Sequence, residues 1–126
     1  MRSQRIFILS PHTLLARGVE LLLTGRPVLR IVGTETDIGE GIKRICRLHP
    51  DVVILGNGGQ PSMSLEEVSS VFEASPGTAV VVLRPADNLL HVYQDDEVTV
   101  ANVEDLVQAI RRIGQARPRP SRRWSA

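Results

Sequence analysis

The segment Pro50-Asp51-Val52-Val53-Ile54-Leu55-Gly56 decides the fold of this chain. Its apolar run is short, rich in β-branched residues and followed by glycine, a pattern that favours a strand buried on both faces of a parallel sheet. Gly56 then opens the glycine-rich loop 56–60. In open α/β sheets, ligands bind at the carboxyl ends of the strands. The end of this strand is therefore a candidate ligand site.

Strand-like runs alternate with helical patterns on both sides of this segment. The other runs are residues 5–9, 28–33 and 78–83. Strands that alternate with helices of this length indicate parallel βαβ units. The sequence predicts an α/β protein of the flavodoxin-like class, with a doubly wound parallel sheet in the strand order 2-1-3-4-5.

Three helices are expected between these strands. Ser10 at the N-cap and Pro11 at the first position would begin one. Its predicted apolar face consists of Leu14, Leu15, Gly18, Val19, Leu22 and Leu23. Asp37 and Glu40 form a capping box for the second, on whose apolar face Cys46 is expected to be buried. The third begins at Ser64 and ends before Pro76.

The alternation breaks after the run 78–83. Residues 89–93 and 97–101 each alternate apolar and polar positions, and they flank the polar turn 94–96. Period-two patterning on both sides of a short turn predicts a β-hairpin in place of a fourth helix and a fifth strand. Asn102, with Asp105 three residues later, is expected to cap a last helix.

Composition describes one ordinary domain with a basic end. The chain has 126 residues, 42% of them hydrophobic, and a net charge of +1. We expect one folded domain at residues 1–114 and a flexible basic tail at residues 115–126. A lone Cys46 excludes an internal disulfide. The first apolar run is too short for a signal peptide or a membrane span, so a cytoplasmic protein with no membrane contact is expected.

Several strings, in order, resemble the receiver domains of bacterial response regulators, above all those that precede LuxR-type output domains. They are Ile8-Leu9-Ser10-Pro11-His12, Ile31-Val32-Gly33, Pro50-Asp51-Val52-Val53-Ile54-Leu55 and Glu104-Asp105-Leu106-Val107-Gln108-Ala109-Ile110. The resemblance covers roughly residues 5 to 83 and 102 to 113. It implies a module of two-component signal transduction. It also implies a phosphoacceptor aspartate after the third strand, two carboxylates for Mg²⁺ after the first, a hydroxyl after the fourth and a lysine after the fifth.

This chain departs from the receiver pattern at each of those positions. The matching residues are Ser10, Pro11, Gly56, Arg84 and Thr99. Glycine cannot act as a nucleophile, and proline offers no side-chain oxygen to a hard cation. The sequence therefore predicts a degenerate pseudo-receiver with no metal, no cofactor and no enzymatic activity.

Three functions remain open from the sequence. The leading one is a phosphorylation-independent regulatory module that contacts a protein partner, or a second copy, through a hairpin face of Leu90, Val92, Tyr93, Val98 and Val100. The second is a sensor of a small anion or nucleotide, bound by Gly56, Asn57, Gly58, Gly59 and Arg84. The third is an accessory nucleic-acid binder that uses Arg117, Arg119, Arg122, Arg123 and Trp124 of the tail.

Overall fold

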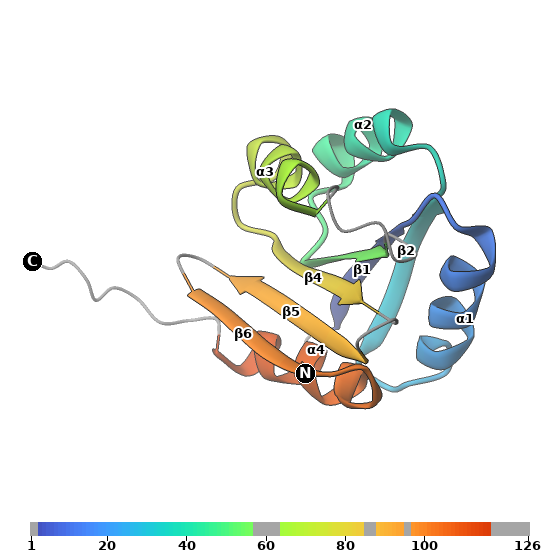
Figure 1. Cartoon of the computed structure of the whole chain (residues 1–126), viewed down its shortest axis with the longest axis vertical. Helices are drawn as coiled ribbons and strands as arrows, with labels where there is room; N and C mark the ends of the chain where they lie inside the picture. The colour runs from blue at the N-terminus through green and yellow to red at the C-terminus, as the bar shows by residue number, and fades with distance from the viewer. Residues whose placement is uncertain (1–2, 57–63, 85–87, 95–96, 117–126) are drawn as a thin grey trace, which may run out of the picture.

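The computed structural model describes residues 3–56, 64–84, 88–94 and 97–116. They form one sheet of six strands in the order β2-β1-β3-β4-β5-β6, with helices on both faces (Figure 1). The strands are β1 (Gln4–Leu9), β2 (Leu29–Glu35), β3 (Val52–Gly56), β4 (Ala79–Arg84), β5 (Leu89–Gln94) and β6 (Glu97–Asn102). The helices are α1 (Thr13–Leu23), α2 (Ile38–Leu48), α3 (Ser64–Ala74), the 3₁₀ turn η3 (Val103–Asp105) and α4 (Leu106–Ala116).

The flavodoxin-like fold is confirmed, and so is the hairpin. Strands β2, β1, β3 and β4 are parallel, whereas β5 is antiparallel to both β4 and β6. The first strand of the hairpin is one residue longer than predicted, because Gln94, expected in the turn, belongs to β5 and lies opposite Glu97. Helix α4 continues to Ala116, two residues into the segment that the sequence assigns to the tail.

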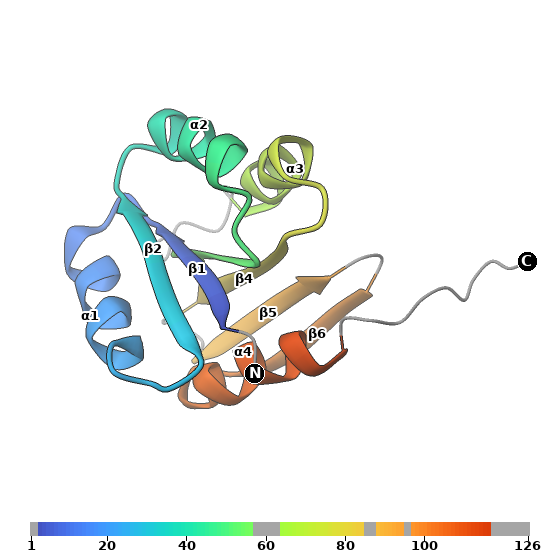
Figure 2. The same cartoon turned by 180° about the vertical axis from the view of Figure 1, so that it is seen from behind.

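Two cores lie on opposite faces of the sheet, because successive strand residues point to opposite sides. Ile6 and Ile8 of β1 belong to the core under α1 and α4. Phe7 and Leu9 belong to the core under α2 and α3. Figures 1 and 2 show these pairs of helices on the two sides of the sheet. Strand β3 is buried along its whole length, as its apolar run requires.

Helix α1 differs from its prediction at its start and in its rotation. Its N-cap is His12, which is extended, so Ser10 and Pro11 precede the helix and do not begin it. The residues that it buries are Ala16, Val19 and Leu23. Because the helix turns these toward the sheet, Leu14 is on the opposite side and is 86% exposed. The predicted apolar face is therefore wrong in part.

Helix α2 confirms Asp37 as its cap but not the reciprocal bond of a capping box, because the Asp37 N–H donates to Glu35, and it corrects the predicted buried face. The Asp37 carboxylate accepts a hydrogen bond from the Glu40 N–H at 3.1 Å. Ile45 is fully buried, but Cys46 is exposed. Consecutive helical residues are turned by about 100° from each other, so Cys46 is rotated out of the core that Ile45 enters. The prediction of a buried cysteine is wrong.

Glycine at position 33 is required by a close approach between β2 and its neighbour. The register between β1 and β2 shifts after Ile6, so that Phe7 lies opposite Gly33. A Cβ atom on Gly33 would lie 2.6 Å from the Phe7 ring. The guanidinium of Arg44 covers the same ring at 5.3 Å from its centroid. This stack anchors α2 over the two strands.

In the described ranges, no helix is long and apolar enough to span a membrane.

Candidate functional site

The carboxyl ends of β1, β3 and β4 bring together three of the residues singled out by the sequence. Ser10 follows β1 directly, and Gly56 ends β3 beside Leu83 of β4. Arg84, one residue further, is half-buried at the same edge and makes a polar or electrostatic interaction of its own. This edge is where an α/β sheet of this class holds a ligand.

Ser10 makes hydrogen bonds through its hydroxyl to the main chain around it, both as donor and as acceptor. Its side chain is 1% exposed, and its Oγ donates to the carbonyl of Gly56 at 2.7 Å. The same Oγ accepts a hydrogen bond from the N–H of His12 at 3.1 Å. Ser10 thus ties the end of β3 to the loop that leads into α1. Its hydroxyl is used for structure and is not directed at a ligand.

Leu15 fills the space into which a side chain on Gly56 would project. A Cβ atom built on Gly56 would lie 2.5 Å from Leu15 Cδ2 and 3.3 Å from Ser10 Oγ. A real Cβ cannot approach another atom so closely without displacing it. A side chain at this end of β3 would therefore have to displace the end of the Leu15 side chain.

The residues at this edge do not fit a Mg²⁺ site. Pro11 has no side-chain oxygen, and the Gly56 carbonyl already accepts from Ser10. Mg²⁺ is held by anionic oxygens and keeps several waters, and neither Ser10 nor Pro11 supplies such an oxygen. Within the described ranges, no three side chains of the metal-binding types gather in a cluster.

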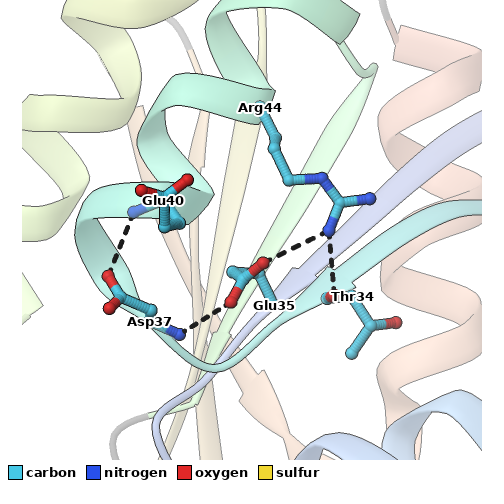
Figure 3. Close-up of polar contacts among 5 residues, drawn as sticks. All are labelled: Thr34, Glu35, Asp37, Glu40 and Arg44. Carbon is cyan, nitrogen blue, oxygen red and sulfur yellow. Dashed lines mark hydrogen bonds and ion pairs between the residues drawn. The ribbon is translucent and has the colours of Figure 1, made fainter.

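Glu35, at the end of β2, is the carboxylate nearest to this edge in the sheet register. Both of its carboxylate oxygens already have partners within the chain. Its main-chain carbonyl accepts from the Ser10 N–H at 3.0 Å. Its Oε2 accepts from the Asp37 N–H at 3.1 Å, and its Oε1 lies 3.3 Å from Arg44 Nη1. Arg44 also donates to the Thr34 carbonyl (Figure 3). This carboxylate fixes the turn between β2 and α2.

Thr99 does not belong to this site. It pairs with Val92, which pairs with Val81 of β4. Thr99 is therefore two strands away from β4 and level with Val81, three residues before Arg84. It thus lies about 10 Å from β4 across the sheet and about 10 Å from the level of Arg84 along the strands. The inserted antiparallel strand β5 displaces β6 outward, and the inclusion of Thr99 in the pocket is wrong.

The structure divides the predicted hairpin face in two. Leu90 is fully buried and Val92 is 7% exposed, because both contribute to the core under α4. The prediction that Leu90 and Val92 belong to an accessible face is wrong. Tyr93 is partly buried against the other core. Val98 and Val100 are each 55% exposed, so the accessible part of this face lies on β6.

Two groups of predicted site residues lie outside the described ranges. They are Asn57, Gly58 and Gly59 of the glycine loop, and Arg117, Arg119, Arg122, Arg123 and Trp124 of the basic tail.

The sequence does not predict the contact between Leu15 and Gly56, although Leu15 packs against the core as expected. Leu14 and Leu22 of the predicted apolar face are exposed, as is Leu21, which that face omits. Leucine occurs at so many positions of this helix that the pattern supports more than one rotation. Ala16, which is buried, was the available signal for the correct one.

Comparisons with known proteins agree on the fold. The sequence matches no protein-family model. Over 78 residues it is 26% identical to the protein-glutamate methylesterase/protein-glutamine glutaminase 2 of Methanosarcina acetivorans, a match that covers 62% of this chain and 22% of that protein. The chain thus spans about a fifth of the length of this curated relative.

Three solved structures are similar to this one. The response regulator domain of Thermotoga maritima CheB aligns with a TM-score of 0.54 and 11% identity, over 95% of this chain and all of that domain. The signal receiver domain of NarL from Mycobacterium tuberculosis has a TM-score of 0.54 and 22% identity, covering 70% of this chain and 74% of the other. A LuxR-family response regulator from Aurantimonas sp. SI85-9A1 has a TM-score of 0.55 and 19% identity, covering 64% and 57% respectively. These likenesses show that the chain has the fold of a response-regulator receiver domain.

Proposed function

We propose that this chain is a regulatory module that acts through contact with a protein partner and does not use aspartyl phosphorylation. It carries out no catalysis and needs no metal or cofactor. The receiver fold supplies the scaffold, and the surface of the hairpin supplies the contact. The observation that carries the proposal is the packing of Leu15 and Ser10 over Gly56.

This packing removes the switch as well as the nucleophile. A phosphorylation signal needs an acceptor carboxylate, a metal to balance its charge and space for the added group. At Gly56 the acceptor is missing, and the space is occupied by a leucine side chain. The hydrogen bond from Ser10 ties the end of β3 to the loop before α1. In this proposal the partner recognises a surface that is already formed.

The surface we propose for that contact is the outer edge of the sheet. Val103 N–H donates to the carbonyl of Asn88 at 3.2 Å, and bonded pairs alternate along an antiparallel ladder. By this alternation the backbone N–H and C=O groups of Thr99 point toward β5. Those of Val98 and Val100 point away from it, toward the open edge of the sheet. The same two valines expose their side chains. An edge of this kind accepts an extended segment of a partner as a further strand.

Two measurements test the proposal together. The purified chain, incubated with acetyl phosphate and Mg²⁺, is expected to keep its unmodified mass. Partners captured by the wild type are identified and remade as pure proteins, and their affinities are measured for Val98→Asp and Val100→Asp. We expect each substitution to weaken binding by about tenfold or more. Buried Val92 is unsuitable for this purpose, because an aspartate there would unfold the core.

Thr99→Asp is the matched control. Thr99 is exposed on the same strand, but its side chain lies on the other face of the sheet. A charge there is expected to leave the affinity for the partner nearly unchanged. Phosphorylation of the chain, or equal binding by the valine variants and the wild type, would contradict the proposal.

The two alternative functions stay predictions. Binding of an anion or nucleotide at Gly56–Gly59 with Arg84 would raise the thermal stability in the presence of phosphate or nucleotides, and Arg84→Ala would remove the effect. Nucleic-acid binding by the tail would depend strongly on salt and disappear when residues 117–126 are deleted.

A further inference from the structure

Helix α1 exposes a stripe of leucines on the side that faces away from the sheet. Leu14, Leu21 and Leu22 are 86%, 64% and 42% exposed. Together with Gly18 they follow the spacing i, i+4, i+7 and i+8, which places them on one face of a helix. Large apolar side chains gathered on a surface mark a contact with another molecule more often than isolated ones do. In Figure 1, α1 stands at the outer edge of the molecule beside β2.

Gly18 makes this face hollow at its middle. A Cβ atom at this position would meet nothing within 4 Å, and glycine inside a helix costs about 1 kcal/mol relative to alanine. Neither the local backbone nor the packing of the single chain explains this residue. A glycine between leucines lets the backbone of a second helix approach closely.

We propose that the second helix is α1 of another copy of this chain, packed antiparallel across a two-fold axis. The axis passes between Gly18 and Val19, the level at which the glycine leaves room. Leu14 of one copy then lies level with the last turn of the other copy's helix, where Leu21 and Leu22 are exposed. Each copy offers the same hollow and the same leucines, as a two-fold interface requires.

The charges beside the leucine stripe favour a second copy of this chain as the partner, with the two helices antiparallel. Arg17 and Glu20 lie on one flank of the leucine stripe, and neither forms an ion pair with another described residue. In an antiparallel pair with the axis at this level, Arg17 of each copy lies opposite Glu20 of the other. In a parallel pair, Arg17 and Glu20 of the two copies would lie on opposite sides of the seam, and this ion pair could not form. Opposite charges across an interface set its register and exclude the alternatives.

Analytical ultracentrifugation of the whole chain over a wide range of concentrations tests the dimer. The wild type is expected to show a monomer–dimer equilibrium, and Leu21→Ser is expected to raise its dissociation constant by about tenfold or more. Gly18→Gln separates the interface from the fold. Glutamine is a better helix former than glycine, so this variant should melt at a higher temperature as a monomer while losing the dimer.

A charge exchange tests the register. Arg17→Glu and Glu20→Arg should each weaken the dimer, and the double exchange should restore it. Val98→Ser on the hairpin is the control and should leave the dissociation constant unchanged. A chain that stays monomeric at every concentration, or a dimer insensitive to Gly18→Gln, overturns this proposal. Partner binding through β6 is measured separately and would survive that result.

Discussion

Leu15 lies in the space into which a side chain on Gly56 would project. The sequence shows that the strand ends in glycine, which has no side chain. Only the structure reveals the position of Leu15, since this depends on how far α1 is rotated and on where it begins. A residue's absence can be read from a sequence. The neighbour that replaces it is determined by packing between distant segments.

The contact predicts a coupling between Gly56 and Leu15. Gly56→Ala places a methyl group 2.5 Å from Leu15 Cδ2, and overpacking of this kind costs about 1–3 kcal/mol. Leu15→Ala removes the obstructing atoms, at a cost of its own. In the double variant the penalty of Gly56→Ala should largely vanish, and urea unfolding of the four proteins measures this coupling. Strictly additive costs would show that Leu15 does not fill the space.

Glu67, in the first turn of α3, predicts a small dependence of stability on pH. Partial burial raises the pKa of its carboxyl above 4.5, and Glu66 raises it further. As the pH rises through 4.5, the unfolded chain loses this proton first, so the folded state is disfavoured at neutral pH. Glu67→Gln should stabilise the protein at pH 7, by no more than about 0.5 kcal/mol. The gain should disappear below pH 4.

The carboxyl itself can be followed by NMR titration. Its pKa in the folded protein should lie above 4.5 and move down when Glu66 is replaced by glutamine. A pKa at or below 4.5 would remove the reason for the expected gain in stability.

Among the elements, strands were easier to predict than the orientation of helices. The buried run of β3 and the alternation in β5 and β6 each have one interpretation, because strand residues have only two sides. The hairpin that replaces a helix was predictable for this reason. The face of α1 was not, because leucines occupy positions all around it. Cys46 failed similarly, since one residue along a helix changes the direction by about 100°.

Two helix starts with the same sequence signal predict different energetic effects. Asp37 caps α2 with a hydrogen bond to the Glu40 N–H, whereas Asn102 precedes η3 without a side-chain cap bond. Asp37→Ala should therefore cost about 1 kcal/mol in the free energy of unfolding, and Asn102→Ala less than about 0.5 kcal/mol. Chemical denaturation of both variants checks the difference. If the two variants lost the same free energy of unfolding, the side-chain cap bond would not be what determines the stabilisation by these residues.

At the scale of the whole molecule, the hairpin lies between β4 and the last helix, and α4 returns to the first strand. Gln4 donates from Nε2 to the carbonyl of Ile110 at 3.0 Å, a buried bond between residues 106 positions apart. Ile110 and Leu106 also complete the core that β1 shares with α1. The first strand and the last helix are therefore joined by a buried polar contact within an apolar interface.

This junction predicts that α4 is an integral part of the cooperative fold. Gln4→Ala removes the bond and should lower the free energy of unfolding by about 1 kcal/mol, with the urea dependence unchanged because the same surface is still exposed on unfolding. Gln108→Ala, an exposed change on the same helix, is the control and should stay within about 0.5 kcal/mol of the wild type. Amide exchange in α4 should accelerate only as much as exchange in β3. If α4 alone exchanged faster, the helix would open independently of the sheet, and the contact at Gln4 would be local.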